Sequence, residues 1–282
     1  MSRTVHKRFA IALLREALAS AGTLHLDHRI DHEREVIHGW EPRRSANDPA
    51  PPPPLDPDAD PAQQLGKGIV NAAMDAGGMV PFSTEIELEP DFLDLYFEPD
   101  PSGAAAPGLL GELTRASCIL TPFHQTPNEG DGRDAMRLGL GLWAMQGRNA
   151  AEAQTPRPEV APSWLISTDP SKVLISGFGM KPSQPSGLHV SAPMLAMNAI
   201  VLSELPRTRA TLLLRLLGTG TLLEEALAEQ AALPADSRER RAARAALLAI
   251  AAEPVPIGEK RKSPVLQACR RAYETWAKAI EG

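Results

Sequence analysis

Four of the seven histidines of this 282-residue chain lie close together, in the stretch HLDHRIDHEREVIHGWEP. If this stretch is helical, His28 and His32 lie at a spacing that lets two imidazoles bind one zinc ion. Glu35 or His38 then lies near enough to be a third ligand. The flanking residues do not follow the HExxH pattern, and short runs of His, Asp, Glu and Arg also occur on solvated faces. A metal site and a solvated polar face therefore both remain as interpretations.

A carboxylate of the first predicted helix is a second candidate for chemistry. Residues 5–20 predict a helix that is apolar around most of its circumference, and we expect it to pack on a sheet. Glu16 follows Phe9 by seven residues and Leu13 by three, so we expect it to point with them toward the packed surface. A carboxylate in that position needs a partner or a metal ion.

Strands that could position further acidic groups follow the histidine-rich stretch. STEIEL alternates apolar residues with glutamates, and Glu89-Pro90-Asp91 supplies a turn into a second strand, FLDLYFEP. LLGELTRA predicts a short helix, and CILTPF predicts a third, brief strand. A helix over residues 132–149 and a strand over residues 163–168 come next.

The remainder of the chain predicts two more strand regions and then helices. Strands are expected through KVLISGF and LHVSAPMLAMNAIVLSEL, and Gly177-Phe178-Gly179 is expected to end the first of them. RTRATLLLRLLG predicts a docking helix that starts at Leu205-Pro206 and stops at Gly218. Leu212, Leu213, Leu216 and Leu217 should fill its buried face, and Arg207, Arg209 and Arg215 should pair with carboxylates of the sheet half. Three more helices follow: LLEEALAEQAAL, residues 237–252 and residues 264–280.

The order helix, three strands, helix, strand resembles the core shared by PD-(D/E)XK nucleases and their relatives. The resemblance implies an α/β fold with a restriction-endonuclease-like mixed sheet and a helical C-terminal extension. It also implies acidic groups that hold Mg²⁺ or Mn²⁺, which activates water and stabilises charge on the phosphate being cleaved. Asp94, Glu87 and Glu16 are then the expected catalytic residues, with Asp94 and Glu87 as metal ligands. The structural alternative for Asp94 is a strand residue paired with an arginine or a backbone amide.

The third strand departs from the pattern of that superfamily. It should offer Glu, Asp or Gln, then one residue, then Lys, but this chain has Leu120-Thr121-Pro122-Phe123-His124. The departure favours an inactive or altered site over an active metal-dependent nuclease.

A second resemblance covers most of the chain except residues 22–80. AIVLSELPRTRATLLLRLLGTGTLLEEALAEQAALP is similar to part of a group of largely uncharacterised cyanobacterial and myxobacterial proteins, which share a strand, ELPRT, LLLRLLG and a helix ending in LP. In that group the upstream half resembles the PD-(D/E)XK superfamily, here through DLYFEP at 94–99 and TPFH at 121–124. Relatives tend to carry an acidic residue where this chain has Thr121, which again points to a pseudoenzyme.

Charge and missing motifs exclude several classes of protein. The net charge of −6 and the aromatic content of 4% argue against broad coating of nucleic acid. Gly218-Thr219-Gly220 lies between predicted helices, which is typical of a helix end and not of a phosphate-binding loop, and no other cofactor signature is present. No G-x-S-x-G elbow is present. No apolar run is long enough to span a membrane, and Cys118 and Cys269 lie in segments that suit buried thiols of a cytoplasmic protein.

These patterns predict two regions and leave two functions open. Residues 1–203 should form the α/β core, with a His- and Pro-rich insertion at about 22–80, and residues 204–282 a helical extension packed on it. Within the insertion, residues 45–60 predict an extended linker or loop. One hypothesis is a PD-(D/E)XK-like protein in nucleic-acid transactions such as mobile-element biology or defence. The other is a non-enzymatic adaptor that binds protein partners through its C-terminal helices.

Overall fold

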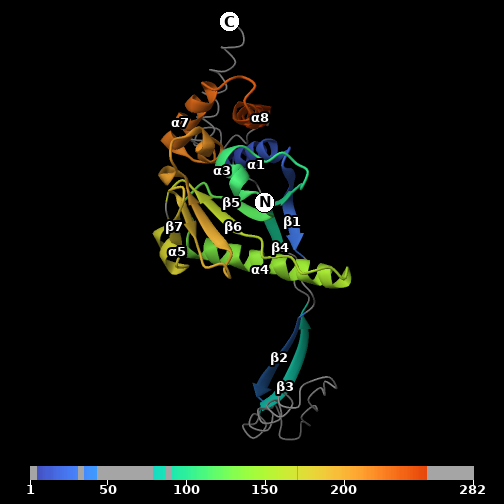
Figure 1. Ribbon diagram of the computed structural model, residues 1–282. Coiled ribbons are helices and arrows are strands. Elements are labelled where there is room, and N and C mark those ends of the chain that lie inside the picture. Colours follow the sequence, from blue (N-terminus) through green and yellow to red (C-terminus); the bar gives the residue numbers. More distant parts are fainter. Residues whose placement is uncertain (1–4, 31–34, 43–78, 87–90, 170, 253–282) are drawn as a thin grey trace. The chain divides into compact units, whose positions relative to one another are not determined.

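The computed structural model describes residues 5–30, 35–42, 79–86, 91–169 and 171–252. The chain divides into two compact units, one formed by Met1–Ile30 with Asp91–Gly282 and the other by Asp31–Pro90. The first unit is a mixed α/β structure built on a seven-stranded sheet (Figure 1). In the second unit, β2 (Glu35–Pro42) pairs with β3 (Met79–Ile86) in an antiparallel two-stranded sheet.

The main sheet has the strand order β1-β4-β5-β6-β9-β8-β7. The pairs β5/β6 and β6/β9 are parallel, and the other neighbouring strands are antiparallel. In the order of the sheet, the strands are β1 Gly22–Ile30, β4 Asp91–Pro99, β5 Cys118–Pro122, β6 Ser163–Ser167, β9 Met197–Val201, β8 Leu188–Val190 and β7 Lys181–Ser183.

The first half of the sheet follows a simple path along the chain. Helix α1 (Val5–Leu18) leads into β1, which pairs antiparallel with β4, and β4 pairs antiparallel with β5. Helix α4 (Glu129–Glu152) then crosses over, so that β6 returns parallel to β5. Apart from the second unit, which lies between β1 and β4, and the short helix α3 (Gly108–Leu113), which lies between β4 and β5, the order is helix, three antiparallel strands, helix and parallel strand. The helices and strands predicted over these segments are confirmed, except for the identity of the first strand.

The pairing predicted between STEIEL and FLDLYFEP is wrong. β3 pairs with β2, whereas β4 pairs with β1, and residues 87–90 of the expected turn lie outside the described part of the chain. Leu24 and Leu26 of β1 stand opposite Phe97 and Leu95 of β4, and all four side chains belong to one apolar core. Burial of these cross-strand pairs stabilises the observed register.

Helices cover both faces of the sheet (Figure 1). Helix α1, helix α3 (Gly108–Leu113) and the C-terminal helices pack on one face, over a core that includes Phe9, Leu120 and Ile200. Helices α4 and α5 (Lys172–Gly177) pack on the other face, over smaller clusters that contain Tyr96 and Leu165. Strands β5 and β6 are therefore buried on both faces, which explains their short and almost wholly apolar sequences.

The C-terminal part is helical, as predicted, and α8 packs against α1. The predicted leucine face is confirmed, because Leu212, Leu213, Leu216 and Leu217 are all buried. The predicted helix start at Leu205-Pro206 is wrong, since a turn and a 3₁₀ segment come first. The segments are η1 Leu202–Glu204, η2 Arg209–Thr211, α6 Leu212–Arg215, α7 Gly220–Ala231 and α8 Arg238–Ala252, and the helix expected at 264–280 lies outside the described residues.

Arg207, Arg209 and Arg215 form ion pairs within the helical C-terminal part. The expectation that their partners lie in the sheet half is wrong. Their carboxylate partners all come from α7 and α8, so these ion pairs connect the segment before α7 to the two helices that follow it. The pairs are Arg207–Glu225, Arg209–Glu239 and Arg215–Glu229.

KVLISGF forms helix α5 (Lys172–Gly177) and not the predicted strand. The hydroxyl of Ser171 accepts a hydrogen bond from the Leu174 amide, which starts a helix. Gly179 follows the helix with φ +59, so the Gly-Phe-Gly sequence ends a helix instead of a strand.

Two further expectations concern membranes and thiols. Within the described ranges, no helix is long and apolar enough to cross a membrane. Cys118 is fully buried, and burial raises the pKa of its thiol to about 12, so it stays protonated at neutral pH. Cys269 lies outside the described residues.

Candidate functional site

The three predicted catalytic carboxylates do not form a described cluster. Glu16 is exposed on α1 beside Arg15, so the expectation that it points into packed surface is wrong. The backbone of Asp94 belongs to β4, but its side chain lies outside the described part of the chain. Glu87 lies outside it entirely.

The predicted histidine pair is not held on a helix. Residues 22–30 form strand β1, so the spacing of His28 and His32 does not place them on one helical face, and His32 lies outside the described residues. Where side chains are described, no group of three or more His, Cys, Asp or Glu could hold a metal ion.

The structure instead brings His28 into a polar cluster with four residues that the sequence did not single out. His25 Nε2 lies 2.7 Å from Glu98 Oε2, an edge-strand contact between β1 and β4. The Tyr96 hydroxyl lies 3.4 Å from Glu98 Oε1, at the long limit for a donated hydrogen bond. Gln146 of α4 donates a hydrogen bond of 2.8 Å to the same hydroxyl. We call these residues, His25, His28, Tyr96, Glu98 and Gln146, the β1–β4 cluster.

Three aromatic rings form the centre of the β1–β4 cluster. The ring centroids of His25 and Tyr96 lie 5.8 Å apart with an interplanar angle of 28°. Those of His28 and Tyr96 lie 4.9 Å apart, and those of the two imidazoles 5.4 Å apart. Tyr96 is 2% exposed, so the rings of both histidines rest on a buried phenol.

A backbone irregularity at Asp27 makes this arrangement possible. Residues three apart in a regular strand point to opposite faces, yet His25 and His28 both contact Tyr96. Between them, Asp27 has φ +49, a left-handed conformation that non-glycine residues rarely adopt. This residue interrupts the alternation of β1 and turns His28 toward the cluster.

The surroundings of the β1–β4 cluster shift the pKa values of two of its side chains, His28 and Tyr96. Burial, and then the neighbouring His25, lower the pKa of His28, so its imidazole stays neutral further into the acid range. Burial is the main cause that raises the pKa of Tyr96, so the phenol remains protonated. A neutral imidazole, a phenol and a carboxylate-bound imidazole can together accept, hold and donate protons. That is the chemistry available to the described residues of this site.

A second group of polar residues lies at the end of the predicted third strand. Strand β5 ends at Pro122, Thr121 is half-buried, and His124 is exposed. The ring of His124 lies 6.3 Å from that of His6, whose Nε2 donates a hydrogen bond of 2.7 Å to the Leu217 carbonyl. This strand therefore carries an imidazole at its end and no carboxylate.

Comparisons with models of protein families, with curated proteins and with solved structures found no match to this chain.

Proposed function

We propose that this chain is a PD-(D/E)XK-like protein that acts in nucleic-acid transactions, such as those of mobile elements or defence. One observation carries the proposal: apart from the insertion between β1 and β4 and the short helix α3, the chain runs through α1, β1, β4, β5, α4 and β6 as helix, three antiparallel strands, crossover helix and parallel strand. This is the element order of that superfamily's core, and Asp94 lies in the second of the three strands, where the superfamily places a metal ligand.

The residues of the third strand do not fit a bound Mg²⁺ or Mn²⁺. Leu120, Thr121 and Pro122 offer no carboxylate to complete a site with Asp94, and no lysine to orient a water molecule. We therefore assign no metal-dependent step to this chain. The proton-handling groups that adjoin Asp94 along β4 are Tyr96 and Glu98, with His25 held by Glu98.

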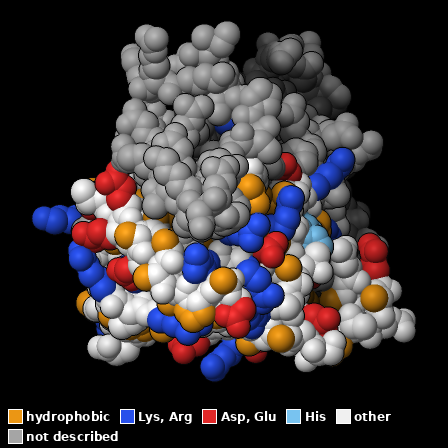
Figure 2. Space-filling view, turned by 90° about the horizontal axis from the view of Figure 1, so that it is seen from above, with side chains coloured by type: hydrophobic (Ala, Val, Ile, Leu, Met, Phe, Trp, Pro, Cys, Tyr) orange, Lys and Arg blue, Asp and Glu red, His pale blue; other side chains and the backbone are white. Residues whose placement is uncertain are grey.

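The face shown in Figure 2 carries Lys and Arg side chains interspersed with Asp and Glu. This face offers a nucleic acid separate basic side chains and not a continuous positively charged surface. This agrees with a protein of net charge −6 that binds at one site and does not coat nucleic acid.

Cleavage of labelled single- and double-stranded DNA and RNA, with Mg²⁺ or Mn²⁺, tests whether the site is active. The wild type is compared with Asp94→Ala, with His25→Gln, and with Glu152→Ala as an exposed control on α4. The third strand predicts no metal-dependent cleavage by any of the four proteins. Cleavage that Asp94→Ala abolishes and Glu152→Ala retains would show a working nuclease.

The second candidate function is an adaptor that binds protein partners through the C-terminal helices. The same departure at Thr121 and Pro122 favours it, because a protein without catalysis has no need of the acid and lysine of the third strand. Pull-down with the full chain, beside a variant altered on exposed residues of α7, would detect such partners.

A further inference from the structure

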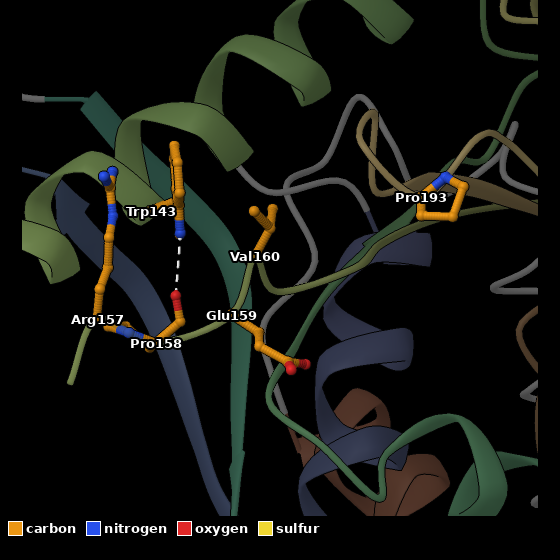
Figure 3. A pocket seen from close by; sticks show the side chains of 6 residues that line it. All are labelled: Trp143, Arg157, Pro158, Glu159, Val160 and Pro193. Carbon is orange, nitrogen blue, oxygen red and sulfur yellow. Dashed lines mark hydrogen bonds between the residues drawn. The ribbon is translucent and has the colours of Figure 1, made fainter.

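An open surface pocket of about 430 Å³ lies beside helix α4, within the first unit of the chain (Figure 3). Its walls come from α4, from the segment before β6 and from the loop before β9. The lining residues are Trp143, Arg157, Pro158, Glu159, Val160 and Pro193. The volume lies in the range of ligand sites in proteins, roughly 300–1,000 Å³.

The indole of Trp143 forms a fixed wall of this pocket. Its Nε1 donates a hydrogen bond of 3.0 Å to the Pro158 carbonyl, and the guanidinium carbon of Arg157 lies 3.4 Å from the ring centroid. Figure 3 shows Arg157 on one side of the indole and the apolar walls Val160 and Pro193 on the other. The guanidinium therefore covers one face of the ring, and the second face is turned toward the apolar part of the pocket. A wall held in this way loses little conformational entropy when a ligand binds.

The pocket adjoins the β1–β4 cluster. Trp143 and Gln146 lie three residues apart on α4, a spacing that makes side chains neighbours on a helix surface, and Gln146 donates to the Tyr96 hydroxyl. Leu142 and Ala161, which are chain neighbours of two lining residues, pack with Tyr96 in one buried cluster. A ligand in the pocket would thus lie next to the proton-handling groups of the candidate site.

The charges at the rim favour a ligand with a negative charge on one side. Arg157 is exposed, and among the residues that the structure describes it makes no ion pair and no hydrogen bond. Figure 3 shows Glu159 pointing away from both the indole and Arg157. An anionic group can therefore approach Arg157 from the side away from this carboxylate, and a guanidinium binds phosphate oxygens through two parallel hydrogen bonds.

An aromatic platform beside an available guanidinium suits a nucleotide. Any base can stack on an aromatic face, and such stacking contributes about 1–3 kcal/mol per base. A base inside a duplex is paired and stacked on its neighbours, so only an unpaired base can use the platform. Because the pocket is open, a strand can continue on both sides of the bound nucleotide.

We propose that the pocket around Trp143 binds one unpaired nucleotide of a single strand, an inference that rests on the proposed role in nucleic-acid transactions. The base stacks on the indole face opposite Arg157, against Val160 and Pro193, and a flanking phosphate pairs with Arg157. The contact between Arg157 and Trp143 holds the stacking part and the ionic part of the site together. The substrate class of the candidate site is then single-stranded nucleic acid, delivered beside the β1–β4 cluster.

Equilibrium binding of the full chain to a labelled single strand of about ten nucleotides tests the inference. The comparison is an abasic strand of the same length, which keeps the phosphates and lacks the bases. We expect Trp143→Ala and Pro193→Ala to weaken binding of the base-bearing strand by about tenfold, and Trp143→Phe to weaken it less, because phenylalanine keeps a stacking face. Neither alanine variant should change binding of the abasic strand or of a duplex, whereas a folding defect would lower the binding of all three.

The ionic part of the site is tested by Arg157→Gln. This variant should weaken binding of both single strands several-fold, and the slope of log affinity against log salt should become smaller by about 0.7, the value for one phosphate contact of a single strand. Arg133→Gln is the matched control, because Arg133 is an exposed arginine of the same helix that pairs with Glu129. It should leave the affinity and the slope unchanged.

Three results would overturn the inference. If the wild type binds the strand and both alanine variants bind it equally well, the nucleic-acid role stands and the pocket takes another ligand, such as a segment of a partner protein. Equal losses for the base-bearing and the abasic strand in both variants would show that no base is bound there. Absence of binding by the wild type to any strand or duplex would remove the proposed function together with this inference.

Discussion

Arg215 is the largest side chain without any solvent exposure in the described residues. Its guanidinium binds both carboxylate oxygens of Glu229, and its Nη2 donates to the Thr208 carbonyl at 3.2 Å. These bonds tie the turn before α6 to α7. A fully buried guanidinium needs such partners, because desolvation of the charge is otherwise very costly.

Replacement of Arg215 by methionine should destabilise the protein much more than the same change at Arg207. Arg215→Met removes the buried partner of Glu229 and one of the donors to the Thr208 carbonyl, at a cost of roughly 2 to 4 kcal/mol. Arg207 is 67% exposed in its pair with Glu225, and its loss should cost less than about 1 kcal/mol. Denaturant midpoints of the two variants measure the difference, and equal midpoints would contradict this account of the Arg215 bonds.

His6 should make the protein less stable in mild acid. Burial lowers its pKa below the ordinary value of 6.5, so the unfolded chain takes up the proton first as the pH falls. The contribution of His6 to stability is therefore complete above about pH 6.5 and declines below it. His6→Gln can keep a donor near the Leu217 carbonyl and should flatten the dependence of Tm on pH between about 5 and 7. An unchanged slope in this variant, with His28→Gln measured alongside, would show that His6 does not titrate as described.

At the scale of elements, two glycines differ in the space around them. Gly22 is in close contact with a neighbouring strand, whereas Gly177 has free space beside it. A Cβ at Gly22, the first residue of β1, would lie 2.1 Å from the carbonyl oxygen of Glu98 on β4. A Cβ at Gly177, at the end of α5, would meet nothing within 4 Å. Strands β1 and β4 are therefore so close at Gly22 that no side chain fits there.

Alanine at these two positions should have opposite effects. Gly22→Ala forces the β1–β4 pair apart and should cost roughly 1 to 3 kcal/mol. Gly177→Ala restricts the unfolded chain without a clash and should be neutral or stabilise by up to about 1 kcal/mol. Thermal unfolding of both variants checks this, and a Gly22→Ala protein as stable as Gly177→Ala would argue against the observed register of β1.

The sequence was sufficient for elements with strong local patterns and insufficient for pairings between distant segments. Helix α4 could be predicted from its length and apolar periodicity, and the leucines of 212–217 from their clustering. The pairing of β1 with β4 could not, because the two strands are separated by the whole second unit. KVLISGF has a composition that suits a strand, but the Ser171 cap and local packing favour a helix.

In the candidate site too, the sequence indicated a residue by its type but not the neighbours that come from distant segments. His28 was noticed for its residue type, but its neighbours follow from the tertiary pairing of β1 with β4 and from the left-handed Asp27. His25, Tyr96 and Glu98 each sit in an ordinary strand pattern, so only the register shows that they meet. Gln146 of α4 has no sequence signal that links it to Tyr96.

At the scale of the whole molecule, the second unit interrupts one pair of adjacent strands. Ile30 at the end of β1 and Asp91 at the start of β4 are partners in the antiparallel register. The insertion Asp31–Pro90 thus occupies the place of a hairpin turn, where a two-residue turn could join the strands.

Replacement of Asp31–Pro90 by Asn-Gly should leave the first unit folded. Where side chains are described, the apolar core of that unit is built from residues before Asp31 and after Pro90, so we expect a cooperative thermal transition within a few degrees of the full chain. Circular dichroism and calorimetry measure this outcome. Loss of the cooperative transition would mean that the second unit contributes to the stability of the first.

Equilibrium binding of the full chain to labelled single- and double-stranded DNA and RNA, without Mg²⁺ or Mn²⁺, tests the proposed role in nucleic-acid transactions. If the protein has this role, we expect saturable binding of at least one of these ligands, with an affinity that falls as salt rises from about 50 mM to about 200 mM. No binding of any ligand at protein concentrations of about 10⁻⁴ M, the weak end of non-specific affinities, would contradict a role in nucleic-acid transactions.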